Sequence, residues 1–439
     1  MRHGILLGLL LSGSVFATDL PTSLDLRNVN GENFVSAVKK QSGGTCWTHA
    51  TMASVESNLM VSGTWDAQRE TGEPNLAEYH LDWWNGFNRH FNSDATDTHG
   101  LTVHQGGDYL VATAYLARGG AVRDVDGQSY GSAPDHNSLS FHHYYPRHAD
   151  WLVDSTPEES IRRIKEAVST NGVVGTALAW SSSFFDSGNS TFYQPPTSTM
   201  GANHAVSIVG WDDNKKTGAN ARGAWLIKNS WGTSWGEDGY FWISYYDKFA
   251  GRDEFMGAVS FRGVEPLSYD KIYSLDLHGW RATKSGASSA FNVFAASPQS
   301  EHPGKGESLK AVSFFTTSHD SDYTVHVYST FANGELKNEI ASANGHESNR
   351  GFHTVDLTSP VSLSPGQKFY VQVELSKGGH AFDKTSEVPV LLCGGNEKVI
   401  VKSRAQAGES FYLKNGAWTD LTQDESSGNF AIKALSVFN

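Results

Sequence analysis

The chain has 439 residues, of which 38% are hydrophobic, 12% aromatic and 18% charged. This length favours about two or three domains, because a single hydrophobic core rarely exceeds roughly 250 to 300 residues, and the apolar fraction excludes a mainly disordered protein. The 34 basic and 47 acidic residues give a net charge of −13, which disfavours nonspecific binding to nucleic acid or to an anionic membrane surface.

The first residues have the pattern of a secretory signal peptide. Arg2 and His3 precede an apolar run at residues 5–11, and small or permissive residues continue to Ala17. The run is too short to anchor the chain across a membrane. We therefore expect residues 1–17 to be a signal peptide and the chain to be secreted or periplasmic, with no membrane span. The alternative is an apolar first strand of the first domain.

The next part, residues 18–264, mixes helical and strand patterns. Residues 45–59 have the length and composition of a buried helix. A second helix is predicted at residues 161–168, because Thr156 and Pro157 suit the N-cap and first position of a helix. Mixed α and β structure is expected here.

From about Pro266 onward the chain is typical of short strands. Residues 311–315, 323–328 and 369–374 alternate or run apolar, and clusters of Ser, Asn, Gly and Pro separate them. Residues 265–439 are therefore predicted to form an all-β sandwich domain.

The chain has two cysteines, Cys46 and Cys393. They fall in different predicted domains, so no structural disulfide is expected between them. A thiol outside the cell is exposed to oxidation, and Cys46 therefore needs a chemical reason to be kept. Cys393 follows an apolar run and is predicted to be a small buried hydrophobe.

Cys46 lies where a nucleophile would be expected. It follows the glycine pair Gly43 and Gly44 and begins a predicted helix. The positive end of a helix favours the thiolate, and its N–H groups can bind a developing oxyanion. Gln41 could donate a second hydrogen bond to that oxyanion. The structural alternative is a buried cysteine at the end of a glycine-rich loop.

A base and its partner lie further along the chain. His204 starts an apolar segment, and Asn229 ends the next one. A thiol nucleophile needs a base that takes and returns its proton, and an imidazole needs a partner that fixes its ring. Cys46, His204 and Asn229 are therefore the predicted catalytic residues, together with Gln41.

Residues 20–262 resemble a papain-like cysteine peptidase. Five motifs follow one another in the order of that family: residues 20–27, Gln41 with Cys46-Trp47, residues 75–81, residues 104–107, and residues 228–232 with 235–240. The resemblance implies an α+β fold with a helical left lobe and a β-rich right lobe. The sandwich resembles the lectin-like domains that follow some bacterial papain-like peptidases.

The resemblance also implies the substrate-binding residues. Gly106 and Gly107 would pair with the backbone of a bound peptide. Val174 and Ala205 would line the pocket for the residue two positions before the scissile bond. Trp231 would shield the hydrogen bond between the catalytic histidine and asparagine.

The sequence departs from the family pattern in three ways. Gln41 precedes Cys46 by five residues (46 − 41), whereas the family has six, so a tighter oxyanion loop is expected. The cysteines of the family's disulfides are missing. The inhibitory propeptide is also missing, since only Thr18 and Asp19 separate the predicted cleavage site from Leu20, and activity without maturation is expected.

Other polar residues are given structural interpretations. His49 could be a second base, but a buried, hydrogen-bonded histidine is favoured. The histidines His142, His143 and His148 lack a carboxylate or cysteine at a recognisable ligand spacing, so no metal site is predicted. Residues 124–127 begin like a calcium loop without its closing glutamate, and a turn is favoured.

These features predict a secreted cysteine endopeptidase that acts on peptides or proteins and requires no cofactor. The sandwich would bind a glycan or another cell-surface ligand. The alternative function is a non-cleaving adhesin or carbohydrate-binding protein on a papain-like scaffold. The complete set of catalytic residues favours the enzyme.

Overall fold

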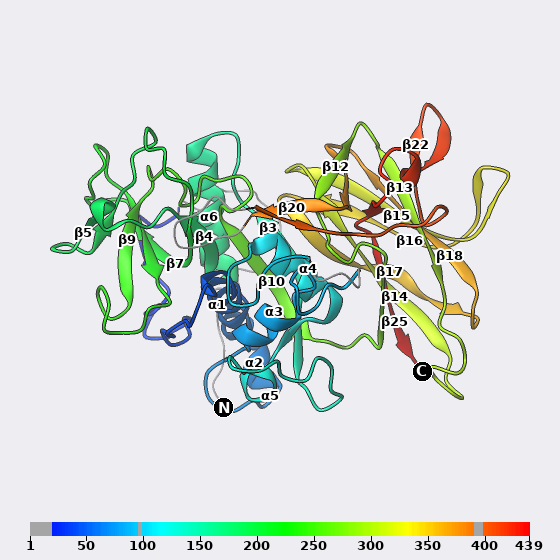
Figure 1. Cartoon of the computed structure of the whole chain (residues 1–439), viewed down its shortest axis with the longest axis horizontal. Coiled ribbons are helices and arrows are strands. Elements are labelled where there is room, and N and C mark those ends of the chain that lie inside the picture. Colours follow the sequence, from blue (N-terminus) through cyan, green and yellow to red (C-terminus); the bar gives the residue numbers. More distant parts are fainter. Residues whose placement is uncertain (1–19, 95–98, 390–397) are drawn as a thin grey trace.

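The structure is a computed structural model that describes residues 20–94, 99–389 and 398–439 (Figure 1). The predicted signal peptide and Cys393 lie outside the described residues. The N-terminal part, up to the end of strand β10, combines helices and strands, and the C-terminal part is made almost wholly of strands. The predicted fold class is therefore confirmed. None of the helices in the described part combines the length and apolar character that a membrane crossing requires.

The helices gather in the middle of the molecule around one central helix (Figure 1). This helix, α1, starts at the predicted nucleophile, and its residues are buried as far as Leu59. Two of its serine side chains are satisfied by backbone carbonyls: Ser54 Oγ donates to Val173 O (2.6 Å) and Ser57 Oγ to Phe34 O (2.7 Å). Small hydroxyl groups thus let other segments approach α1 closely. The helices are α1 (Cys46–Val61), α2 (Thr64–Ala67), α3 (Glu78–Trp84), α4 (Tyr109–Gly119), α5 (Asp124–Gly127) and α6 (Pro157–Asn171).

Two predicted segments can be compared with these helices. The helix expected at residues 161–168 is confirmed within α6, where Thr156 Oγ1 accepts a hydrogen bond from Glu159 N (3.3 Å) and Pro157 takes the first position. The turn expected at residues 124–127 is instead the single helical turn α5. The backbone bond from Gln128 N to Asp124 O (2.9 Å) closes that turn.

The β-rich lobe of the N-terminal part is organised around β7. This strand pairs with β1, β4 and β8, and β9 extends the sheet beyond β8. The pairing of β7 with β4 sets His204 opposite Leu178 at one end of the lobe. The strands are β1 (Ser23–Asp25), β4 (Val174–Leu178), β5 (Phe185–Asp186), β6 (Thr191–Phe192), β7 (His204–Asp212), β8 (Ala224–Lys228) and β9 (Tyr240–Ser244), with a short 3₁₀ helix at Ser182–Phe184.

The C-terminal part is a sandwich of two sheets. Strands β16-β15-β18-β13-β22-β23 form one six-stranded sheet, and the other is built around β17-β14-β25-β11, with β12, β19 and β24 beside it. The two sheets enclose a core that includes Phe294, Val325 and Val371. The predicted strands at residues 311–315, 323–328 and 369–374 are confirmed within β14, β15 and β18.

The bounds of these strands are β11 (Lys271–Ser274), β12 (Ala282–Ser285), β13 (Ser289–Ala295), β14 (Glu307–Thr316), β15 (Ser321–Ala332), β16 (Glu335–Glu347), β17 (Arg350–Leu363), β18 (Lys368–Leu375), β19 (Gly379–Asp383), β22 (Ser410–Lys414), β23 (Ala417–Asp420), β24 (Asn429–Phe430) and β25 (Lys433–Phe438). A separate hairpin joins β20 (Ser386–Pro389) to β21 (Lys398–Val401), and a 3₁₀ helix covers Leu421–Gln423.

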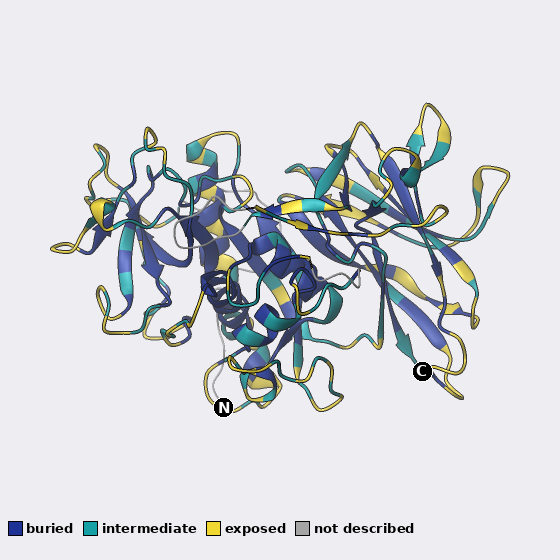
Figure 2. Cartoon of the chain, in the orientation of Figure 1, coloured by how far each residue is buried: buried dark blue, intermediate teal, exposed yellow. Residues whose placement is uncertain are grey.

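The two parts share a β-sheet. Strand β3 (His143–Trp151), whose start also pairs with β2 (Ala121–Val122), lies between β10 (Val259–Pro266) and β17. The hydrophobic cluster around α1 also includes Phe315 and Phe352 of the C-terminal part, and the centre of the molecule is mostly buried (Figure 2). The predicted domain boundary at residues 264–265 falls inside β10. We call the pairing of β3 with β17, with the side chains around it, the seam.

Candidate active site

Cys46 is the first residue of α1 and is 2% exposed. Thr45, at the N-cap, turns its hydroxyl back to the carbonyl of Ser42 (3.0 Å) and does not cap the helix. Backbone N–H groups in the first turn of a helix have no partner within the helix. The thiol therefore lies at the positive end of a buried helix whose amides can stabilise negative charge.

The imidazole of His204 is oriented by Asn229. His204 Nε2 lies 2.8 Å from Asn229 Oδ1, and Ser230 N donates to the same oxygen (2.8 Å). The Ser230 bond identifies that atom as the amide oxygen, so Nε2 must carry the proton. The other nitrogen, Nδ1, is then left with a lone pair that can accept a proton.

Aromatic rings cover this pair. Trp231 stacks on His204 with ring centroids 4.5 Å apart and an angle of 21° between the rings. Trp180 and Trp235 each contact Trp231 edge to face, at 4.9 Å. These rings limit the access of water to the hydrogen bond between His204 and Asn229, as the family resemblance implies for Trp231.

Burial sets the charge of the base. His204 is 5% exposed, and desolvation lowers its pKa to about 4, although the hydrogen bond that His204 donates to Asn229 opposes this shift. A buried imidazole is therefore neutral at pH 7. It is in the form that can take a proton from a thiol.

Gln41 is fixed to the segment that carries Asn229. Its backbone N donates to Ser230 O (2.8 Å), and its Oε1 accepts from Ser230 Oγ (2.6 Å). Its Nε2 donates to the carbonyl of Gly43 (2.9 Å), within the loop that leads to Cys46. An amide nitrogen carries two hydrogens, so one remains for a substrate oxyanion.

The predicted peptide-binding glycines lie beside the nucleophile loop. Gly44 N donates to His104 O (2.7 Å), and Gly44 forms a bridge with Gln105. A Cβ on Gly107 would come within 2.6 Å of the Trp47 ring, so a side chain there would displace the ring next to the nucleophile. Gly106 has a φ of +106°, which also favours glycine.

The structure does not set Val174 and Ala205, the two predicted pocket residues, opposite each other. Ala205 follows His204, but Val174 lies opposite Ile208, farther along β7, in the core of the β-rich lobe. The residue opposite Ala205 is Ala177. The correct register could not be obtained from the sequence, because the strand at residues 174–178 is buried throughout and gives no period-two pattern. Ala177 is therefore the candidate partner of Ala205 at this end of the cleft.

A buried ion-pair network supports the site from behind. Lys39 Nζ contacts Glu56 (2.8 Å) and Glu78 (2.5 Å), and Lys228 Nζ donates to Ser36 Oγ (3.0 Å). Burial lowers the pKa of Lys228 to about 8. The network holds the strand end that precedes Asn229 against α1 and α3.

His49 lies beside this network. It is 7% exposed, and its Nδ1 lies 2.8 Å from Thr45 O. Burial lowers the pKa of His49. The interpretation of His49 as a buried, hydrogen-bonded histidine is confirmed.

One polar cluster beside the cleft was not predicted. His104 forms an ion pair with Asp82, which raises the pKa of His104, and its ring stacks on Tyr130 at 4.0 Å. The carbonyl of His104 is the group that binds Gly44 N. The cluster therefore braces the nucleophile loop. Nothing in the sequence indicated this ion pair, because Asp82 and His104 belong to different segments of the chain.

The three histidines considered as a metal site do not come together. His142 forms an ion pair with Glu70 just before β3, whereas His148 lies farther along β3, next to His353. The sequence could not predict that His148 and His353 meet, because their strands are about 200 residues apart and no local spacing of residues indicates that they pair.

Comparison with known proteins covers both parts of the chain. Residues 20–255 match the family described as papain family cysteine protease, and residues 272–436 match the family described as lectin like domain. Cathepsin L2 of Homo sapiens is 26% identical over 231 residues, which are 52% of this chain and 61% of that protein. Zingipain-2 of Zingiber officinale is 29% identical over 231 residues, 51% of this chain and 86% of that protein. The chain thus spans less than two thirds of cathepsin L2.

A solved structure matches the whole arrangement. It contains the cysteine protease and lectin-like domains of Cwp84, a surface layer associated protein of Clostridium difficile. The sequence identity is 25% and the TM-score 0.73, over 95% of this chain and 89% of that one. A second structure, of a clostridial Cwp84 after propeptide cleavage, gives the same identity and score over 97% of its length.

Proposed function

This chain belongs to the papain family of cysteine proteases, and we propose that it is an endopeptidase with Cys46 as its nucleophile. The observation that carries the proposal is the bond from His204 Nε2 to Asn229 Oδ1 under the Trp231 ring. It leaves Nδ1 to serve as the base on a strand that packs against α1. An adhesin would have no need of an oriented, neutral imidazole on a strand that packs against the helix begun by Cys46.

The proposed reaction has two steps. His204 Nδ1 takes the thiol proton, and the sulfur attacks the carbonyl carbon of the scissile bond. The resulting oxyanion accepts hydrogen bonds from Cys46 N–H and Gln41 Nε2. His204 then gives its proton to the leaving amine, which leaves a thioester on Cys46. A water molecule, deprotonated by His204, hydrolyses the thioester and restores the thiol.

The test is hydrolysis of a fluorogenic peptide by the full chain and its variants. We expect Cys46→Ala to reduce kcat at least about 10⁴-fold, and Asn229→Ala to leave measurable activity because it only orients the base. Ser62→Ala, at the far end of α1, is the matched control. An alkylating thiol reagent should abolish the wild-type rate. If Cys46→Ala hydrolysed the peptide at the wild-type rate, the proposal of a cysteine peptidase would be refuted, and the non-cleaving adhesin would be the remaining interpretation.

We also propose that the protein is secreted or periplasmic. The signal-like pattern of residues 1–17 supports this, and the similar Cwp84 is a surface layer associated protein. Cell fractionation tests the proposal: the wild type should leave the cytoplasm, and a variant with charged residues in the run at 5–11 should remain inside.

A glycan is the proposed ligand of the lectin-like domain. The support is an aromatic cluster on the outer face of its six-stranded sheet. Along these strands the neighbouring residues Ala290, Phe369 and Tyr412 belong to the sandwich core, so the alternate residues face outward. The cluster consists of Phe291, Phe331, Tyr370, Phe411 and Trp418, with ring centroids 4.8 to 6.1 Å apart for the contacts of Phe291.

Such a cluster suits the apolar face of a sugar ring. Phe291 is fully buried by its neighbours, while Phe411 and Trp418 are partly exposed. Binding to immobilised oligosaccharides should fall about tenfold in Trp418→Ala, because one stacking partner is lost. Ile400→Ala, an exposed apolar residue on the β20–β21 hairpin, is the control. If both variants bound the oligosaccharides equally well, the aromatic cluster would not be the glycan-binding site.

A further inference from the structure

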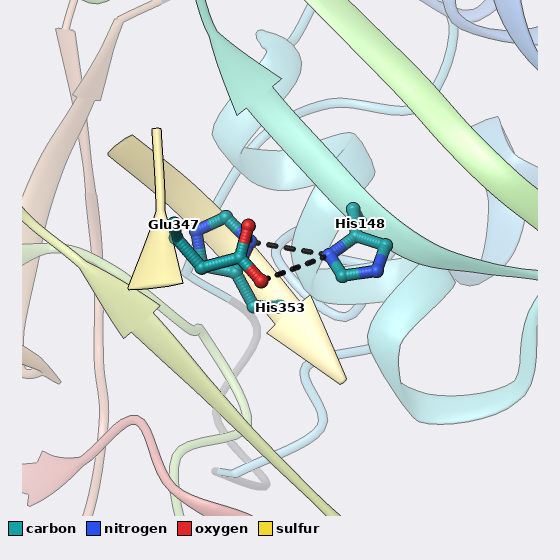
Figure 3. Close-up of side chains that lie close together, drawn as sticks. All are labelled: His148, Glu347 and His353. Carbon is teal, nitrogen blue, oxygen red and sulfur yellow. Dashed lines mark hydrogen bonds and ion pairs between the residues drawn. The ribbon is translucent and has the colours of Figure 1, made fainter. Parts of the chain in front are cut away.

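The seam brings together three side chains that can ligate a metal. Register pairs His148 of β3 directly with His353 of β17. Glu347 ends β16, just before the turn into β17, and its carboxylate lies against both imidazoles. Figure 3 shows that the three side chains point toward one another, His148 from β3, His353 from the neighbouring strand β17 and Glu347 from the end of β16. Two ligands thus come from the lectin-like domain and one from the peptidase domain.

The donor atoms have the spacing of a metal's coordination shell. His148 Nδ1 and His353 Nδ1 are 3.2 Å apart. Glu347 Oε2 lies 3.3 Å from His353 Nδ1, and Glu347 Oε1 lies 3.9 Å from His148 Nδ1. Ligands at Zn–N and Zn–O distances of about 2.0 to 2.2 Å in a tetrahedron lie roughly 3.3 Å from each other. The three atoms therefore need to move little to share one ion.

A hydrogen-bond chain fixes the protonation of His353. Its Nε2 lies 2.9 Å from Thr316 Oγ1, and that hydroxyl donates to Asn349 O (3.2 Å). The hydroxyl proton is used on the carbonyl, so the Thr316 oxygen accepts from Nε2–H. Nδ1 then presents its lone pair to the cluster. Metal-ligating histidines usually have such a partner on the other ring nitrogen.

All three side chains are largely withdrawn from solvent. The side chain of His353 is 0% exposed, that of Glu347 11% and that of His148 15%. The cluster is thus two imidazoles and a carboxylate that meet in a mostly buried position.

Arg262 does not occupy the position of the ion. Its Nη2 lies 3.0 Å from Glu347 Oε2, but its Nε is held by Asp150 at 2.7 Å. The Asp150 carboxylate offsets much of the guanidinium charge near the cluster. The Glu347 oxygen that faces His148 is Oε1, on the other side of the carboxyl group.

We propose that His148, Glu347 and His353 bind a Zn²⁺ ion that ties the peptidase domain to the lectin-like domain. Two imidazole nitrogens and one carboxylate are a donor set suited to zinc, whereas Ca²⁺ and Mg²⁺ prefer oxygen ligands. A cavity of about 590 Å³ borders His148 and Glu347. Water from that cavity can fill the fourth position.

The test is zinc binding to the full chain with Cys46 first alkylated, so that the catalytic thiol cannot bind the ion. After dialysis against a chelator, competition with a chromophoric zinc indicator measures affinity and stoichiometry. We expect one Zn²⁺ per chain and at least a tenfold loss of affinity in His148→Gln and Glu347→Gln. His346→Gln is the matched control, because His346 neighbours Glu347 but pairs with Asp322 (2.8 Å). Ca²⁺ and Mg²⁺ should not compete.

Two further measurements keep the test decisive if a ligand variant fails to fold. Thr316→Val removes only the partner of His353 Nε2 and should weaken zinc binding about 10-fold or more. Zinc should also raise the melting temperature of the alkylated wild type, since a ligand that binds only the folded state stabilises it. An alkylated wild type that binds no zinc, or variants that bind it as tightly as the wild type, would overturn the proposal.

Discussion

The catalytic cleft and the seam are built in different ways. In the cleft, Cys46 begins a helix, His204 begins a strand and Asn229 follows one, and polar contacts orient the side chains, such as that of His204 with Asn229. In the seam, strand pairing and a shared hydrophobic cluster join β3 to β17. Single substitutions in the cleft should therefore change the chemistry and spare the fold, whereas those in the seam should change stability first.

Polar contacts add to the seam on both sides. Arg163 Nη1 donates to Ser348 O (2.9 Å), and Arg350 Nη2 donates to Glu254 O (2.9 Å). Tyr145 OH lies 2.8 Å from Thr354 Oγ1 in a buried position. Buried hydrogen bonds of this kind are costly to leave unpaired. The lectin-like domain is therefore part of the support of the peptidase domain.

The largest effect is expected from removing the lectin-like domain. A chain of residues 18–264 loses Phe315 and Phe352 from the shared cluster and exposes their apolar partners around Trp151. We expect an insoluble or inactive product, measured by soluble yield and peptide turnover. A monomeric fragment with the kcat/KM of the full chain would mean that the seam only tethers a targeting module.

In the cleft, Gln41→Ala should slow turnover by about 100-fold to 1,000-fold with the melting temperature unchanged, because it removes one oxyanion donor. Ser230→Ala keeps the amide but removes the hydroxyl that holds Gln41 Oε1, and a smaller loss in kcat is expected. Steady-state kinetics on one peptide measure both. A loss below about threefold in Gln41→Ala would mean that the shortened loop holds Gln41 away from the oxyanion.

In the seam, Gly351→Ala should destabilise the protein by about 3 kcal/mol through overpacking and backbone strain. Gly351 has a φ of +146°, and a Cβ there would lie 2.0 Å from Ala149 O. Gly366→Ala is the control, because its φ is +72° with no atom within 4 Å of the added carbon. Chemical unfolding gives both values. Equal losses would show that β3 and β17 separate without cost.

The smallest effect concerns His278, which links the two domains by a bond from Nε2 to Gly86 O (2.9 Å). Burial lowers its pKa to about 3, below the unfolded value of about 6.5. The unfolded chain therefore binds the proton first, and the contribution of His278 is lost as pH falls from 6.5 toward 3. The loss of stability from this group amounts to roughly 2 kcal/mol at pH 5, relative to pH well above 6.5.

Unfolding curves between pH 7 and pH 5 measure this contribution. We expect His278→Gln to show a shallower loss of stability than the wild type, because an amide does not titrate in that range. Parallel curves for the two proteins would mean that His278 is solvated in the folded state.

Much of the cleft could be predicted because its residues are fixed locally. Cys46 begins a helix and Asn229 follows the end of strand β8, and both positions follow from hydrophobic patterns and glycine placement near them. The position of Val174 relative to Ala205 could not be predicted, because a strand buried on both faces has no alternation that sets its register. Only the pairing of β4 with β7 identifies Ala177.

The sequence by itself determined the order of the two domains and the helix that begins near Cys46, and it marked His204 and Asn229 as the candidate base and its partner. The domain order and the helix depend on patterns within short segments, which periodicity and residue type report, and His204 and Asn229 were recognised by residue type and motif. The tertiary structure decided that β3 joins both domains and that His148 meets His353, 205 residues away. Such a pairing depends on the register of strands distant in the chain, and no local pattern of side chains specifies it.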